Sequence, residues 1–302
     1  MNNVRSTIST SPVLPAIATW RDWLTLTKPE ITFLVTISAL AGFVLASPDG
    51  INGWTLLWAM IGIPLTSAGG CAMNQVMEHE FDAGMKRTAT RPIPSGRIRV
   101  DHARWYSLAL IGAGLGILCP LTNPLTGILA AFTVALYLWV YTPLKRFSTW
   151  NTLVGTIPGA LPVLGGWTAA SGSLGWGGWV LFGVLICWQM PHFFALAWMY
   201  RKDYGNSVFL MLPSGDESGR KTAIQMLGFS IVMIIFSVLP TALGLSSWIY
   251  AAGAVGLGLW FLQSVGRFWF TRSVQDARKV LKASVMYIPL LLAAIIIDRF
   301  VG

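Results

Sequence analysis

The sequence predicts an all-α integral membrane protein of about nine transmembrane helices. Hydrophobic residues make up 54% of the 302 residues and charged residues only 11%. A soluble domain of this length needs a more heavily charged surface, so lipid must cover much of the exterior. Apolar runs long enough to cross the hydrocarbon core lie at residues 30–47, 53–73, 104–120, 125–143, 150–170, 175–197, 222–243, 247–265 and 281–298.

The spacing of these runs predicts one transmembrane domain over residues 1–302, with two pseudo-repeated four-helix halves and a ninth helix. The polar segments after the second and sixth runs are separated by nearly the same length of chain as those after the fourth and eighth. Such repeats commonly place the site at their interface. Residues 1–19 have no apolar core typical of a cleavable signal, and residues 1–25 are expected to form a flexible and interfacial N-terminal segment.

The charged residues predict the orientation of the chain. All but one of the 21 Lys and Arg residues, the exception being Arg299, fall in the N-terminal segment or in four loops on the same side. The positive-inside rule places this side in the cytoplasm of a bacterial inner membrane, or in the matrix if the protein is mitochondrial. All but Asp49 and Asp298 of the 12 acids lie there too, which indicates a polyvalent site rather than orientation alone. The net charge of +9 therefore does not indicate a nucleic-acid partner.

The first long loop opens with a stripe of three oxygen-bearing side chains. Asn74, Glu78 and Asp82 follow one another at intervals of four residues, and each such step on a helix drifts by only about 40°. The three side chains therefore project from one helical face. Hard oxygen donors on one face suit Mg²⁺, which takes one or two carboxylates and completes its octahedron with water and substrate phosphate. The alternative is an ordinary polar helix end at the membrane surface.

Basic residues follow this stripe closely, namely Lys86, Arg87, Arg91 and Arg97. Guanidinium groups bind phosphate oxygens bidentately, so arginines beside a metal held by the acids would form a clamp for a diphosphate. The positive-inside rule accounts for some of these bases, but it does not account for their position beside the acids.

Three blocks of the sequence resemble the intramembrane UbiA-type prenyltransferases. The resemblance extends from about Leu26 to Pro213, and the remainder of the chain matches mainly in hydropathy. The matching segments are 74–82 with 85–88 and 91–97, then 141–146 with 151–160, and finally 189–194 with 202–204 and 211–213.

The third block most resembles the branch of this superfamily that farnesylates protohaem IX. Quinone-type relatives carry a second Asp-rich motif after the sixth helix, whereas this sequence has His192 near the end of that helix and Asp203 as the only nearby acid. The departure favours haem over an aromatic acceptor and leaves a second metal without a full set of acidic ligands. His192 could ligate the haem iron, pair with a propionate, accept a proton, or simply pack against its neighbours.

The resemblance implies transfer of the farnesyl group of farnesyl diphosphate to a vinyl group of haem b, which gives haem O. Haem b is then a substrate, and Mg²⁺, held by Asn74, Glu78 and Asp82, is the cofactor. Tyr141 would contact the diphosphate or face the allylic cation. The expected diphosphate-binding residues are Lys86, Arg87, Arg91, Arg97, Lys145, Arg146 and Lys202, and the expected catalytic residues are Asp82, Tyr141, His192 and Asp203, with His192 also binding haem. Membrane lipid is an expected partner, and haem A synthase and terminal oxidase assembly factors are candidate partners.

Two alternatives stay open from the sequence. A UbiA-type enzyme of quinone biosynthesis would have the same diphosphate clamp and a different acceptor, and the missing second Asp-rich motif argues against it. A transporter with a basic vestibule would require polar or ionisable residues at the middle of the membrane. The predicted spans contain almost none, which argues against a transporter.

Overall fold

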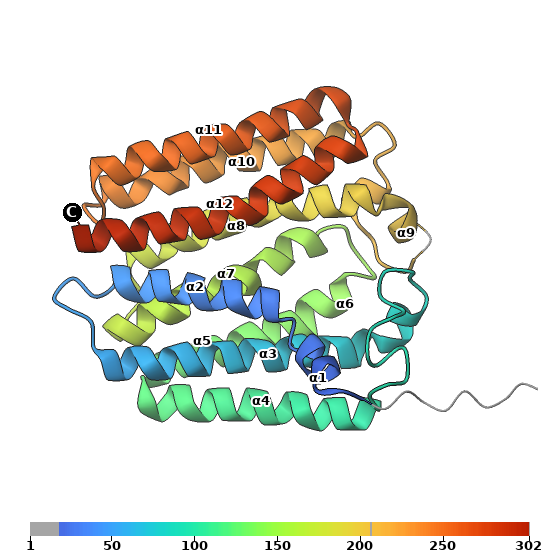
Figure 1. Cartoon of the computed structure of the whole chain (residues 1–302), viewed down its shortest axis with the longest axis horizontal. Coiled ribbons are helices and arrows are strands. Elements are labelled where there is room, and N and C mark those ends of the chain that lie inside the picture. Colours follow the sequence, from blue (N-terminus) through green and yellow to red (C-terminus); the bar gives the residue numbers. More distant parts are fainter. Residues whose placement is uncertain (1–17, 206, 302) are drawn as a thin grey trace, which may run out of the picture.

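The computed structural model describes residues 18–205 and 207–301. These residues form helices that lie side by side along the long axis of the molecule (Figure 1). The elements are α1 (Trp20–Leu26), α2 (Pro29–Leu45), α3 (Gly53–Ala83), α4 (Val100–Leu121), α5 (Pro124–Ala135), the π-helical η1 (Leu136–Tyr141), α6 (Thr142–Leu144), α7 (Asn151–Ser171), α8 (Trp176–Met199), α9 (Arg201–Gly205), the 3₁₀ turn η2 (Leu212–Ser214), α10 (Arg220–Ala242), α11 (Trp248–Thr271) and α12 (Val274–Val301).

The prediction of an all-α membrane protein with about nine spans is confirmed. In the described part of the chain, 8 helices are long and apolar enough to cross a membrane, and α1 with α2 forms a ninth candidate, bent by 51°. One of the 8 is the continuous helix Pro124–Leu144, built from α5, η1 and α6. Large apolar side chains such as Phe132, Ile235 and Leu259 are exposed on the outside, as expected where lipid covers the protein. The chain is a multi-pass membrane protein.

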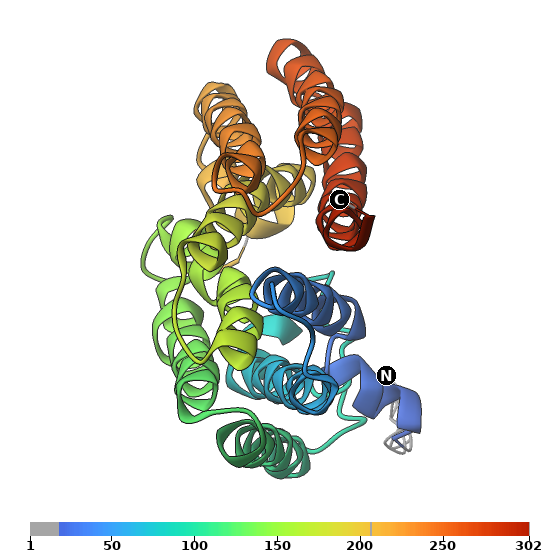
Figure 2. The ribbon, with the colours of Figure 1, turned by 90° about the vertical axis from the view of Figure 1, so that its left-hand side faces the viewer.

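The helices follow one another around a curved array, seen end-on in Figure 2. Neighbours in the array pack in the order α3, α4, α5, α7, α8, α10, α11 and α12, while α2 packs against α3, α7 and α12. Gly42 and Gly166 bring α2 and α7 together, because a methyl group on either would overlap a backbone carbonyl of the other helix. Small residues commonly allow such close approach between membrane helices. The contact holds α2 firmly beside α7.

The polar connections gather at one end of the bundle. In Figure 1, α1, α6, α9 and the loop after α3 lie together at the right-hand end. There the Leu210 amide donates to the Lys145 carbonyl at 2.7 Å and joins two of these connections. At the opposite end, Arg299 donates to the Ser47 carbonyl at 3.4 Å. The two ends thus differ in kind: one carries long polar segments and the other carries short turns.

The prediction that a long basic loop connects the last two spans is wrong. α11 continues to Thr271 and α12 begins at Val274, so the loop expected between residues 265 and 281 is reduced to Arg272 and Ser273. Hydropathy marks the point where a helix leaves the hydrocarbon, but the backbone hydrogen bonds continue as long as each residue finds its partner. The basic side chains expected in a loop therefore lie on helix ends.

The N-terminal segment predicted over residues 1–25 is described only in part, because residues 1–17 lie outside the described residues. Its last part forms α1, which begins at a capping box between Thr19 and Asp22. Gln75 of α3 donates through Nε2 to the Leu26 carbonyl at 2.9 Å. This bond fastens the end of α1 to α3 and positions the kink that leads into α2.

Candidate active site

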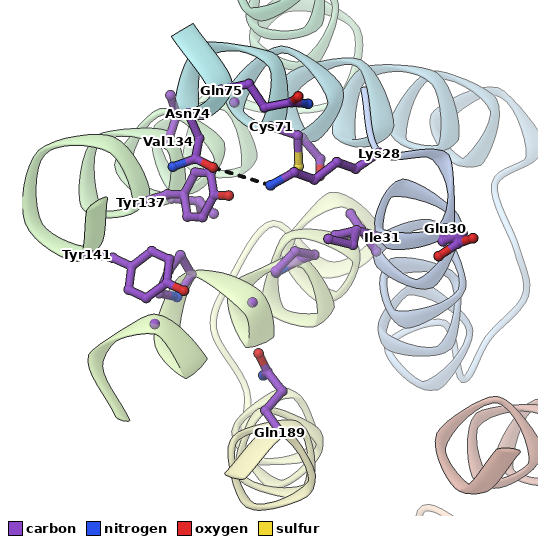
Figure 3. Close-up of a pocket in the computed structure, with 18 of the residues that line it drawn as sticks. Lys28, Glu30, Ile31, Cys71, Asn74, Gln75, Val134, Tyr137, Tyr141 and Gln189 are labelled. Carbon is purple, nitrogen blue, oxygen red and sulfur yellow. Dashed lines mark hydrogen bonds between the residues drawn. The ribbon is translucent and has the colours of Figure 1, made fainter. Parts of the chain in front are cut away.

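A cavity of about 980 Å³ lies among the helices and reaches the polar end of the bundle. Its wall is formed by α1, α2, α3, the helix Pro124–Leu144, α7, α8 and the segment after α9. In Figure 3, polar side chains of α3 lie opposite Tyr137 and Tyr141, and Gln189 points toward the same space from α8. Farther along the same helices the wall becomes apolar, with Ile63, Leu129 and Leu161. The cavity has the size of a ligand site and combines a polar head with an apolar tail.

Three side chains of α3 form a row along the polar head. Asn74, Glu78 and Asp82 are each at most 5% exposed, and all line the cavity because α3 continues as a helix to Ala83. Each of the three is bonded to a different basic side chain. The pairs are Lys28 Nζ with Asn74 Oδ1 at 3.3 Å, Lys145 Nζ with Glu78 Oε1 at 2.9 Å, and Arg91 Nη1 with Asp82 Oδ2.

The pair between Glu78 and Lys145 is the most symmetrical of these contacts. Lys145 Nζ lies 2.9 Å from one carboxylate oxygen and 3.1 Å from the other, and 4.6 Å from the ring centre of Tyr141. Burial disfavours the charged form of Lys145, but the neighbouring Tyr141 phenol and Glu78 carboxylate outweigh it, so that the pKa of Lys145 is raised above its ordinary value. Lys145 therefore keeps its charge at neutral pH, as an anion-binding group must.

Lys28 reaches the site from the kink between α1 and α2, and it is absent from the site residues predicted from the sequence. Its backbone has φ 48°, a left-handed conformation that costs about 1 kcal/mol or more for a residue with a Cβ. The following Pro29 disfavours a continuous helix at this position. Strained backbone of this kind is common at functional sites, and here it accompanies a Nζ that lines the cavity (Figure 3). In the sequence, a lysine directly before a proline at the start of a span was the signal that could have indicated Lys28.

The π-helical turn η1 presents two tyrosines to the cavity. Tyr137 and Tyr141 are stacked with ring centres 5.5 Å apart, and both line the cavity. A π-helical turn carries one more residue than an α-helical turn and is frequent at functional sites. Gly155 of α7 lies directly against the Tyr141 ring, and a methyl group there would overlap it. The orientation of Tyr141 thus depends on a turn and a glycine from two different helices.

Some of the predicted site residues do not line the cavity, namely Lys86, Arg97, Arg146, Lys202 and Asp203. Arg97 instead bonds Asp22 at 2.8 Å and ties the loop after α3 to α1. The Arg146 guanidinium lies 4.9 Å from the ring centre of Phe81, outside the row. Arg87 does line the cavity, where it donates to the Tyr204 hydroxyl at 3.4 Å. In the described part of the chain, the lysines and arginines that line the cavity are Arg21, Lys28, Arg87, Arg91 and Lys145. Of these, Lys28, Arg91 and Lys145 are bonded to the row.

α8 contributes two polar side chains to the opposite wall. Gln189 donates through Nε2 to the Thr156 carbonyl at 3.1 Å and points toward the cavity (Figure 3). His192, one turn later, lines the cavity and places Nδ1 2.8 Å from the Ser284 hydroxyl of α12. The sequence pointed to His192 but not to Gln189.

Similarity to known proteins identifies the family of this chain. The model of the UbiA prenyltransferase family matches residues 35–289. The chain belongs to this family. It is 54% identical over 279 residues to the protoheme IX farnesyltransferase of Salinibacter ruber, across 92% of this chain and 99% of the relative. It is 43% identical over 288 residues to the protoheme IX farnesyltransferase of Solibacter usitatus, across 92% and 99% of the two chains. The resemblance predicted from the sequence is confirmed.

Solved structures share the fold of this UbiA-family chain. A structure of digeranylgeranylglyceryl phosphate synthase in membranes matches with a TM-score of 0.76 and 18% identity, over 92% of this chain and 98% of the other. A UbiA homologue from Archaeoglobus fulgidus, bound to GPP and Mg²⁺, matches with a TM-score of 0.66 and 14% identity, over 91% and 99%. At these identities the likeness establishes the UbiA-type fold.

The row on α3 fits a divalent cation in its donor chemistry. Asn74, Glu78 and Asp82 supply one amide and two carboxylates on a cavity wall. In residues 18–205 and 207–301, no group of three or more Asp, Glu, His and Cys side chains gathers around one metal-sized site. Mg²⁺ seldom uses such a cage and commonly completes its octahedron with water and substrate phosphate. In its donor chemistry the row therefore fits Mg²⁺.

Replacing Gly155 by Ala should displace the Tyr141 ring of this UbiA-family site. Overpacking of this kind costs about 1–3 kcal/mol, and we expect prenyl-transfer turnover to fall by about tenfold or more because one Å of misplacement is enough to slow a reaction strongly. The matched control is Gly256→Ala on α11, where a methyl group meets no atom within 4 Å. Turnover and thermal stability of the two variants check the prediction, and equal turnover in both would contradict it.

Proposed function

We propose that this protein transfers the farnesyl group of farnesyl diphosphate to a vinyl group of haem b and so forms haem O. The observation that carries the proposal is the cavity itself, in which a row of metal-type donors and cations meets an apolar tail. The 54% identity to a protoheme IX farnesyltransferase over 92% of the chain selects haem among the possible acceptors. An aromatic quinone precursor, the alternative acceptor, would suit the same diphosphate clamp, and the identity to protoheme IX farnesyltransferases argues against it.

The three pairs along α3 suggest how diphosphate and metal enter. The oxygens of Asn74, Glu78 and Asp82 are each bonded to a basic side chain. Mg²⁺ held by these oxygens would supply positive charge to the leaving diphosphate. Lys28, Lys145 and Arg91 would then turn toward the diphosphate oxygens, with Arg87 beside them. We assign the diphosphate to these four residues, and the metal to Asn74, Glu78 and Asp82. The Archaeoglobus fulgidus homologue of the same fold is bound to GPP and Mg²⁺, a prenyl diphosphate and the metal proposed here.

The reaction begins when the C1–O bond of farnesyl diphosphate breaks. The four basic side chains stabilise the charge that develops on the diphosphate. The allylic cation that remains lies against Tyr137 and Tyr141, whose ring faces stabilise a cation. The apolar tail of the cavity, with Ile63 and Leu129, holds the prenyl chain and keeps water away from the cation. The terminal vinyl carbon of haem b attacks C1 and leaves a cation on the carbon next to the macrocycle. Water adds to this cation and loses a proton, which gives the hydroxyethylfarnesyl side chain of haem O.

The acceptor is assigned to the wall formed by α8. Its polar groups at the cavity are an amide and an imidazole, Gln189 and His192, with Phe193 beside them. Aromatic side chains and a neutral nitrogen suit a flat macrocycle with a central metal better than a small carboxylic acid. Asp203 does not line the cavity, so we assign it no catalytic role.

The positions of the charges support an orientation in the membrane. We infer a bacterial inner membrane, with the polar end of the bundle and the cavity mouth on the cytoplasmic side, because positive charge is retained there. The chain would act as one transmembrane domain, and lipid surrounds it. Its product is an extremely apolar haem, so haem A synthase and assembly factors of terminal oxidases are the partners we expect to receive it.

The test is product formation by purified protein in lipid nanodiscs. Haem b, farnesyl diphosphate and Mg²⁺ are incubated with the protein, and the extracted haem is analysed by mass spectrometry. We expect haem O with Mg²⁺ and none after chelation by EDTA. A parallel incubation with 4-hydroxybenzoate in place of haem should give no prenylated product. Folded protein that prenylates 4-hydroxybenzoate and leaves haem unchanged would overturn the proposal in favour of the quinone-type activity.

A further inference from the structure

α8 and α12 are joined by two hydrogen bonds that meet at one residue, Ser284. The indole Nε1 of Trp188 donates to the Ser284 carbonyl at 2.8 Å, and His192 Nδ1 lies 2.8 Å from the Ser284 hydroxyl. Trp188 and His192 are one helical turn apart on α8, with ring centres 5.3 Å apart. Ser284 is fully buried. The register of the two helices, and with it the position of the imidazole, is therefore fixed at this point.

The hydroxyl of Ser284 determines which ring nitrogen of His192 carries the proton. A serine hydroxyl has one proton to donate and two lone pairs to accept with. Ser284 donates that proton to the Leu281 carbonyl at 2.7 Å, so its oxygen accepts from His192. The Nδ1 atom is then the protonated nitrogen, and Nε2 has a free lone pair. Among the described residues Nε2 has no hydrogen-bond partner, while the ring lines the cavity.

We propose that Ser284 is a positioning residue that holds His192 as the Nδ1–H tautomer, so that Nε2 is the ligand of the haem iron in the cavity. The proposal rests on the proposed function, since it takes haem b as the occupant of this wall. A histidine that ligates a metal almost always donates its other N–H to a fixed acceptor, which orients the ring and raises its basicity as a ligand. Ser284 has the geometry of that acceptor.

The surroundings of the ring favour the iron over a propionate. Trp188 and Phe193 flank His192 at ring-centre distances of 5.3 and 5.5 Å, and among the described residues no salt bridge involves the ring. A propionate would be bound best by a charged imidazolium or by one of the basic side chains, which lie along α3 instead. A neutral imidazole in aromatic surroundings presents a lone pair, and a lone pair is what iron requires.

The test uses the full-length protein in nanodiscs loaded with ferrous haem b, without farnesyl diphosphate. Resonance Raman spectroscopy records the iron–histidine stretching band, whose frequency rises with the strength of the hydrogen bond at Nδ1. We expect this band in the wild type, its loss in His192→Ala, a shift to lower frequency in Ser284→Ala, and recovery of the wild-type frequency in Ser284→Thr. The matched control is Ser237→Ala, which removes a buried hydroxyl that bonds Tyr287 of α12 at 3.0 Å and should leave the band unchanged.

A second measurement covers the case in which Ser284→Ala does not fold. In His192→Gly, added imidazole can fill the space and donate to Ser284, whereas 1-methylimidazole cannot donate. We expect a higher iron–ligand frequency and tighter binding for imidazole. Equal frequencies for the two ligands, or a wild-type band that persists in His192→Ala, would overturn the proposal. These outcomes are independent of product formation: haem O made without any iron–histidine band would remove the inference and leave the proposed function standing.

Discussion

Replacing Asp82 by Asn is expected to reduce haem O formation by about 10³-fold or more, while the protein stays folded. The substitution keeps the shape of the side chain but removes the charge that a metal requires and that Arg91 now pairs with. Loss of charge stabilisation on a developing anion typically costs 10²–10³ in turnover for a single group, and a weakened metal adds to this. Turnover as a function of Mg²⁺ concentration, with thermal stability in parallel, measures the effect.

The matched control for Asp82 is Glu80→Gln on the same helix. Glu80 is exposed and does not line the cavity, so the same loss of one negative charge at the membrane surface should leave turnover within about twofold of the wild type. If both variants lost activity equally, surface charge rather than metal binding would explain the result. If Asp82→Asn retained full turnover at low Mg²⁺, the metal assignment on α3 would have to be abandoned.

The helical fold could be predicted from the sequence because each span must satisfy its backbone within one apolar segment. The same reasoning misplaced the end of α11 and the start of α12, since hydropathy is blind to a helix that continues into water. A hydropathy pattern also could not predict the π-helical turn at Leu136–Tyr141. The π-helical turn packs against α7 at Gly155, and the sequence alone does not indicate that contact.

The cavity residues were predicted where spacing along one helix decides the geometry. Asn74, Glu78 and Asp82 are such a case, because a regular helix converts a four-residue interval into a shared face. No such regular interval fixes where the basic side chains of the loop after α3 lie. Arg97 pairs with Asp22 instead, since an acid from a distant segment competes for it. Lys28 lies 46 residues before Asn74 in the chain, and the kink between α1 and α2 brings it to the site.

Replacing Lys145 by Met should affect stability and activity together. Glu78 and Lys145 are largely buried, with side-chain exposures of 6% and 16%, so removal of the lysine leaves an uncompensated carboxylate. Breaking a buried pair in this way typically costs about 3–5 kcal/mol. Adding Glu78→Gln to Lys145→Met removes the stranded charge, and we expect most of the thermal stability to return. Haem O formation should stay at least about 10²-fold below that of the wild type in the double variant, because both the lysine that binds the diphosphate and a metal ligand are gone.

The double variant separates packing from chemistry, because its thermal stability is expected to return while its turnover is not. Stability is measured by thermal unfolding in detergent, and turnover by haem O formation at saturating farnesyl diphosphate. Recovery of activity along with stability would mean that the pair only holds α3 against the helix Pro124–Leu144. Recovery of stability alone is expected, because Lys145 and Glu78, which are bonded to each other at 2.9 Å, are the residues assigned to the diphosphate and to its metal.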